Sequence, residues 1–216
     1  MSSPKNARSY IWLPVKFIYF LLALSITCLI IVKSIDYFHP DFDHGFLSDK
    51  KIFFDKWYKY VLYLHILTAP ITIIAGILQF SLPRKKKLHR LAGSIYIVSA
   101  LLAAVAGFFM SFKSIGGLPA SISFMILSCL WIFFTIKAFT CIRAGNIMAH
   151  KSYMTRSFIL ANSAILLRLF SFLSNHYLHG DPVISYIFIS WLSWLPWILL
   201  YEFIRYFSSR FGNDRI

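Results

Sequence analysis

Charged residues are scarce in this chain of 216 residues. They make up 14% of the sequence, and only eight of them are acidic, against 22 lysines and arginines. Because a soluble domain has about 25% charged residues, this composition excludes a soluble globular protein. Apolar residues amount to 58% and the mean hydropathy is +0.67, which predicts an integral membrane protein.

Cysteine is rare as well. The chain has three, Cys28, Cys129 and Cys141, each within an apolar stretch. They cannot form a secreted disulfide framework, and their spacing matches no metal motif. The sequence also lacks a phosphate-binding glycine loop, paired catalytic carboxylates and an arrangement of nucleophile and base. Nothing in it supports a hydrolase.

Long apolar stretches dominate what is present. A membrane-spanning helix needs about 20 apolar residues, because the hydrocarbon core is roughly 30 Å thick. Six stretches meet this length: residues 11–32, 57–80, 89–112, 119–142, 153–174 and 183–204. The first is too long for a cleaved signal peptide, so we expect an uncleaved anchor. The predicted fold is an all-α polytopic bundle of six transmembrane helices.

The basic residues predict the orientation of this bundle, because short cytoplasmic loops collect lysine and arginine. Most of them fall on the side of the N-terminus: in residues 1–10, in the connections before residues 91 and 157, and in the tail 205–216. Six of the eight acidic residues fall on the opposite side, in the loop 33–56 and at Asp181. Both termini are therefore predicted to be cytoplasmic, in a bacterial inner membrane. The net charge of +14 reflects this asymmetry, so a nucleic-acid partner is not needed to explain it.

Small and polar residues recur at helical spacing in the four spans between residues 57 and 174. Membrane helices pack through such stripes, so we expect these four spans to form the core. Spans 11–32 and 183–204 have no such stripe and are predicted to be peripheral. Three of the core spans carry a histidine in the stripe: His65, His89 and His150.

The ionisable residues of the core fall into two layers. His65 and Arg168 lie roughly 12 and 10 Å inward from the outer side, at about 1.5 Å per residue, and His89 and His150 lie at the cytoplasmic ends of their spans. No acidic residue lies at the depth of Arg168. Because an arginine in the hydrocarbon is costly, its partner must be a backbone carbonyl, an acidic loop or an anionic ligand.

Two histidines on facing helices are the usual ligands of a b-type haem and can form part of a divalent metal site. His89 and His150 fit this pattern, and Arg90, Lys151 and Arg156 could hold the propionates. The alternative is that both histidines bond lipid headgroups or loop carbonyls. His65 has a second interpretation too, since Pro70 cannot donate to the carbonyl of Ile66 and nearby polar side chains could do so.

Two further groups of residues carry weaker patterns. Histidines and carboxylates of the outer loops suit a divalent metal but match no defined spacing: His39, Asp41, Asp43, His44, His176, His179 and Asp181. Glu202 lies at the depth of Lys137 and Arg156, and we expect a structural ion pair with one of them.

The order of certain residues resembles a known family. They are His65; Gly76, Gln79 and Phe80; Arg84; His89, Arg90, Gly93 and Tyr96; Gly116 and Gly117; Trp131 and Thr135; Arg143, Ala144 and Gly145; His150, Lys151, Met154, Arg156 and Ser157; and Leu167 and Arg168. Over residues 60–170 the chain resembles a bacterial family of predicted multi-pass membrane proteins, domain of unknown function 2306. The stretch from His150 to Arg168 is the most specific, although Tyr153 stands where tryptophan is expected. The resemblance implies a membrane protein with no assigned reaction.

The leading hypothesis is a small membrane redox or cofactor-binding protein. In it His89 and His150 ligate a b-type haem or metal, and His65 with Arg168 forms a second site for a quinone or other anionic headgroup. One alternative is a permease for a small anionic solute, although no inverted repeat is detectable. Another is a non-catalytic partner in a larger membrane complex or homo-oligomer, docking through Trp191, Trp194 and Trp197.

Overall fold

The computed structural model describes residues 5–43, 45–47, 50–81, 87–177 and 180–210, with only the backbone for residues 5–17, 19 and 81. Over these ranges the chain is helical and contains no strand, which confirms the all-α fold class. Some predicted features lie outside the described residues: His44, Arg84, His179, residues 1–4 and the tail 211–216.

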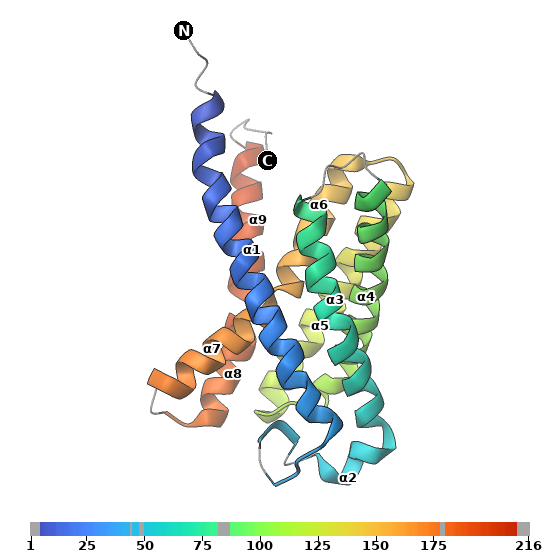
Figure 1. Cartoon of the computed structure of the whole chain (residues 1–216), viewed down its shortest axis with the longest axis vertical. Helices are drawn as coiled ribbons and strands as arrows, with labels where there is room; N and C mark the ends of the chain where they lie inside the picture. Colours follow the sequence, from blue (N-terminus) through green and yellow to red (C-terminus); the bar gives the residue numbers. More distant parts are fainter. Residues whose placement is uncertain (1–4, 44, 48–49, 82–86, 178–179, 211–216) are drawn as a thin grey trace.

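Six stretches of the described chain are long and apolar enough to cross a membrane, which confirms the predicted number of spans. They are Phe20–Phe38, Lys51–Phe80, Lys87–Ser111, Gly117–Arg143, Ile147–Tyr177 and Pro182–Arg210. The first and last helices begin and end at the same end of the molecule (Figure 1), as an even number of spans requires. Which side of the membrane this end faces stays a prediction.

The helices follow one another along the chain (Figure 1), and the longest connection lies between α1 and α2. They are α1 (Lys5–Ile35), α2 (Lys51–Phe53), α3 (Lys59–Ser81), α4 (Lys87–Ser111), α5 (Gly117–Arg143), α6 (Ile147–Ala161), α7 (Ser163–Tyr177), α8 (Pro182–Leu192) and α9 (Leu195–Arg210). A 3₁₀ turn, Asp36–Phe38, follows α1, and a π-helical turn, Phe54–Tyr58, joins α2 to α3.

The centre of the molecule is a bundle of α3, α4, α5 and α6. Each packs against the next along the chain, and α6 closes the ring against α3. Small residues permit this close packing: Ala100 and Ala103 of α4 are fully buried. A Cβ atom on Gly76 of α3 would overlap the Phe158 ring of α6 and lie 3.1 Å from Cε2 of Tyr96.

The fifth span differs from the single core helix that the sequence suggests, because it is interrupted at Asn162. The Asn162 side chain donates to the carbonyl of Phe158 (2.7 Å), and α7 then turns away from the bundle (Figure 1). It packs against α8 and touches α1. Arg168 is therefore carried by a helix at the edge of the core.

The sixth span is interrupted at Ser193 and Trp194, just before Pro196. Pro196 has no amide hydrogen, and Trp197 Nε1 donates to the carbonyl of Leu192 instead (3.1 Å). Trp194 is buried, and its indole donates to Ser123 of α5 (3.0 Å). It is consequently not available as the docking surface suggested by the sequence. Pro70, by contrast, lies within a continuous α3.

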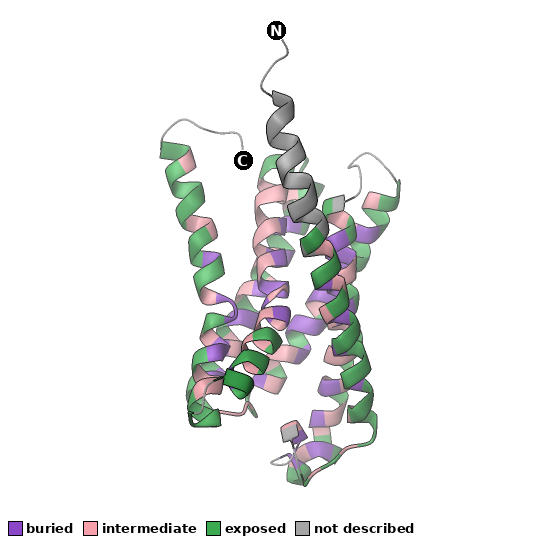
Figure 2. Cartoon of the chain, turned by 60° about the vertical axis from the view of Figure 1, so that its left-hand side comes forward, coloured by how far each residue is buried: buried purple, intermediate pink, exposed green. Residues whose placement is uncertain are grey.

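The first and last helices, α1 and α9, lie at the periphery of the core. Helix α1 packs mainly against α3, and α9 contacts α6 and α8. Figure 2 shows α9 standing apart from α1 and exposed over most of its length. Both spans were predicted to be peripheral from their lack of a small-residue stripe.

Gly76→Ala should lower the stability of the bundle, because the added methyl group needs the space of the Phe158 ring. Overpacking of this kind costs about 1–3 kcal/mol. Thermal unfolding in detergent, followed by tryptophan fluorescence, measures the effect. Val98→Ile adds a carbon at an exposed position of α4 and should leave the midpoint unchanged. Equal midpoints for Gly76→Ala and the unmodified protein would refute the predicted tight contact.

Candidate functional site

A cluster of buried hydroxyl groups joins three core helices, nearer to the end of the bundle at which α4 and α6 begin. The Tyr96 hydroxyl of α4 lies 2.8 Å from Ser157 Oγ of α6, which lies 2.8 Å from Thr135 Oγ1 of α5. All three side chains are fully buried. Because successive core helices run in opposite directions, α4 and α6 run in the same direction and face each other diagonally across the bundle.

This contact fixes the register of the two inner histidines. His89 precedes Tyr96 by seven residues, and His150 precedes Ser157 by seven. Seven residues make almost two full helical turns, about 10 Å along the axis. His89 therefore lies on the same face of α4 as Tyr96, and His150 on the same face of α6 as Ser157. His89 and His150 are therefore at one level, on faces that point toward each other across the core.

His150 is held by a backbone carbonyl of the neighbouring helix. Its Nδ1 donates to the carbonyl oxygen of Ala138 in α5 (2.8 Å). A carbonyl can only accept a hydrogen bond, so Nδ1 carries a proton and Nε2 of the neutral ring keeps its lone pair. Ligand histidines in metalloproteins are oriented in this way.

His89 is held through its backbone. The side-chain amide of Gln79 in α3 donates to the carbonyl oxygen of His89. Gly93, one turn further along α4, makes room for Gln79, since a Cβ atom there would lie 2.9 Å from Gln79 Nε2. The start of α4 is thus fixed against the end of α3 at the level of the histidine.

His65 lies in the other half of the core. Its Nδ1 donates to the carbonyl oxygen of Ala103 in α4 (2.9 Å), and its ring lies 3.5 Å from where a Cβ of Gly107 would be. The carbonyl left free by Pro70 is not its partner, and the Thr68 hydroxyl donates to Leu64 instead (2.6 Å). His65 and His150 therefore both donate from Nδ1 to a carbonyl of the neighbouring helix.

Arg168 projects from α7 and is exposed. Its Nη1 donates to the carbonyl oxygen of Ala164 on the same helix (3.1 Å), which is one of the three partners expected from the sequence. The charge of Arg168 also acts on Tyr37, beyond the end of α1, on Tyr186 of α8 and on His65. Tyr37 and Tyr186 thus lie within electrostatic range of Arg168, in the same half of the membrane as His65.

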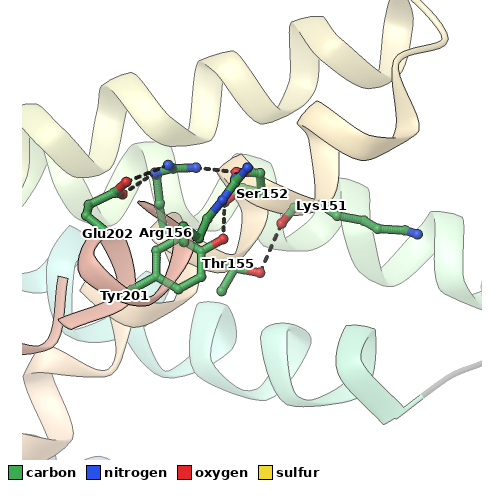
Figure 3. A network of polar contacts seen from close by, with 7 residues as sticks. Lys151, Ser152, Thr155, Arg156, Tyr201 and Glu202 are labelled. Carbon is green, nitrogen blue, oxygen red and sulfur yellow. Dashed lines mark hydrogen bonds and ion pairs between the residues drawn. The ribbon is translucent and has the colours of Figure 1, made fainter. Parts of the chain in front are cut away.

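Arg156 belongs to a different site. It forms a bidentate ion pair with Glu202 of α9, with Nε and Nη2 lying 2.5 and 2.8 Å from the two carboxylate oxygens (Figure 3). The side chains are 14% and 44% exposed, respectively. This confirms the predicted ion pair of Glu202 and selects Arg156 over Lys137, which is exposed. Arg156 is directed at α9 and does not lie beside His89 and His150.

The outer loops provide little for a metal ion. Among the residues that the structure describes, histidine, cysteine and acidic side chains form no group of three or more placed to hold one. His44 and His179 of the predicted outer cluster lie outside that part of the chain.

Sequence reasoning did not find the hydroxyl cluster. Tyr96, Thr135 and Ser157 all occur in the small-residue stripes, which signals that they face inward. Which of them meet depends on the order of the helices in the bundle, and a stripe carries no information about that order.

Glu202→Gln should lower the thermal stability by about 1–3 kcal/mol, because it leaves the guanidinium of Arg156 without its charged acceptor. Asp55→Asn removes one partner of an ion pair with Lys59 at the exposed end of the molecule and should cause no measurable change. Thermal unfolding of both variants in detergent makes the comparison. A Glu202→Gln protein as stable as Asp55→Asn would show that the pair contributes nothing.

Comparison with known proteins places these residues in a family. The model of the predicted membrane proteins called DUF2306 matches residues 62–205, so the similarity extends beyond the expected 60–170 and includes most of the last span. No curated protein and no solved structure matches the chain. Since the match covers more than half of the sequence, the chain belongs to the DUF2306 family of predicted membrane proteins.

Proposed function

We propose that this multi-pass membrane protein binds a b-type haem between α4 and α6, with His89 and His150 as axial ligands, and serves in membrane electron transfer. The observation that carries the proposal is the common register. Both histidines lie two turns from the Tyr96–Ser157 contact, on faces of diagonal helices that point toward each other. Ligand sites in helix bundles are built from facing side chains of this kind.

The hydrogen bonding of His150 supports a ligand role. Donation from Nδ1 to Ala138 orients the ring and leaves Nε2 to bind iron. A haem needs only two protein ligands, whereas a typical zinc site needs three or four, and the described residues supply no such group. Arg90 and Lys151, which follow His89 and His150 in the sequence, would bind the propionates, whereas Arg156 is paired with Glu202.

We further propose that His65 and Arg168 form a second site, for the headgroup of a quinone. The carbonyl oxygens of a quinone accept hydrogen bonds. Arg168 has five N–H donors and uses one of them for the carbonyl of Ala164, so the others would be available to the quinone. Tyr37 and Tyr186 are within electrostatic reach of the same guanidinium. The exposure of Arg168 leaves it accessible to a ligand that diffuses within the membrane.

A permease for a small anion is the second candidate. It is favoured by the interruptions of the fifth and sixth spans, at Asn162 and at Ser193 with Trp194, because transporters often bind solutes at discontinuous helices. A colourless protein that carries anions into proteoliposomes, and loses this activity in Arg168→Gln, would favour the permease over the haem protein.

His150→Asn should abolish the Soret absorbance of protein purified from haem-replete cells. The Asn amide can still donate to Ala138, as Nδ1 does, but it offers no ligand equivalent to Nε2. The variant should therefore remain folded, with a thermal midpoint close to that of the unmodified protein. His89→Ala should also lose the band, while His176→Ala, an exposed position on α7, should keep it. A Soret band that persists in His150→Asn would disprove bis-histidine ligation. So would the absence of the band from the unmodified protein.

Arg168→Gln should weaken the binding of a short-tailed ubiquinone about tenfold or more, since one charge-assisted hydrogen bond is lost. Quenching of tryptophan fluorescence during titration reports the dissociation constant. Lys113→Gln removes a positive charge from the end of the molecule where α4 ends and should leave the constant unchanged. If both variants bind the quinone as tightly as the unmodified protein does, Arg168 is not part of a quinone site.

A further inference from the structure

Two guanidinium groups converge on a single hydroxyl group between α6 and α9. Arg156 donates from Nη1 to Ser152 Oγ, and Arg205 of α9 donates from Nη1 to the same oxygen. The Tyr201 hydroxyl donates to the carbonyl of Ser152 (3.5 Å), as Figure 3 shows. A serine oxygen has two lone pairs, so both are used here and its hydrogen can be donated to a further acceptor.

The charges of this cluster are not balanced within the two helices. Glu202 is the only acidic residue of α6 or α9, and Arg156 engages both of its oxygens. Arg156 is also enclosed by aromatic rings, with its guanidinium carbon 5.7, 5.5 and 5.2 Å from the centroids of Phe134, Tyr153 and Tyr201. Arg205 therefore keeps a full positive charge that neither helix compensates.

The depth of the cluster corresponds to the boundary between headgroups and acyl chains. Ser152 lies five residues after the start of α6, and Arg205 five residues before the end of α9, about 8 Å from each end. The sixth span has 29 residues, more than the roughly 20 that the hydrocarbon requires, so its last turns extend into the headgroup region. Arg205 is exposed there, on a helix that stands apart from α1 (Figure 2).

We infer that Ser152 and Arg205 bind a phosphate group at this edge of the membrane. Arg205 supplies charge and a planar set of donors that suits phosphate oxygens, and the Ser152 hydroxyl donates a further hydrogen bond. Arg156, paired with Glu202, holds the Ser152 oxygen in place. The headgroups of phospholipids carry phosphates at this depth, those of anionic lipids with a net negative charge, and a soluble phosphate offers the same oxygens. The site does not depend on the proposed haem or quinone.

Native mass spectrometry of the full chain in detergent tests the site, with phosphatidylglycerol as the probe. The unmodified protein should retain the lipid, and Arg205→Gln and Ser152→Ala should each weaken its binding, Arg205→Gln about tenfold. Arg210→Gln, which removes the same charge five residues further along α9, is the matched control and should retain the lipid. The absorbance spectrum of Arg205→Gln should equal that of the unmodified protein.

A second arm identifies the source of the phosphate. If inorganic phosphate raises the thermal midpoint of the unmodified protein but not that of Arg205→Gln, and no lipid is retained, the site takes soluble phosphate. Equal lipid retention in Arg205→Gln and Arg210→Gln overturns the proposal, because only general attraction to the membrane would remain. Absence of both the lipid adduct and the thermal shift overturns it as well.

Discussion

The structure depends on hydrogen bonds from polar side chains to backbone carbonyls of neighbouring helices. In the hydrocarbon no water is present to satisfy polar groups, so each must find a partner within the protein. His65, Gln79, Ser123 and His150 all donate across a helix interface to a carbonyl oxygen. Such bonds require the backbones to approach closely, and the glycines and alanines of the core make that approach possible.

These bonds fix more than the distance between helices. Because each joins a particular side chain to a particular carbonyl, it also sets how far one helix is shifted along the next. The level shared by His89 and His150 is a consequence of that register. The bond of His150 to Ala138 also selects the ring nitrogen that carries the proton, so one interaction can stabilise the bundle and orient a ligand. A structural role and a ligand role for this histidine are therefore compatible.

The sequence predicts those properties that depend on composition along one helix. The number and approximate lengths of the spans are of this kind. The ion pair of Glu202 joins two helices, so the sequence indicated its depth but left Lys137 and Arg156 as alternative partners. The interruption at Asn162 was missed because hydropathy averaged over a span hardly registers one polar residue. Pro70, by contrast, removes one amide hydrogen and leaves α3 continuous. The direction of Arg156 could have been predicted from the sequence. It follows His150 by six residues and therefore lies on a different face of α6. The contact between Tyr96 and Ser157 could not be derived from the sequence, because it depends on the order of the helices in the bundle.

The middle of the core separates its two polar ends. Tyr96, Thr135 and Ser157 are fully buried and bonded to one another, and Ala100 and Ala103 pack beside them without exposed surface. A solute could cross this layer only if the helices moved apart. Arg168 differs, since among the described residues its one hydrogen bond is to Ala164, and a guanidinium with unused donors is costly in the hydrocarbon. The polar groups of the core thus lie in two parts of the bundle, with a layer of small and mutually bonded side chains between them.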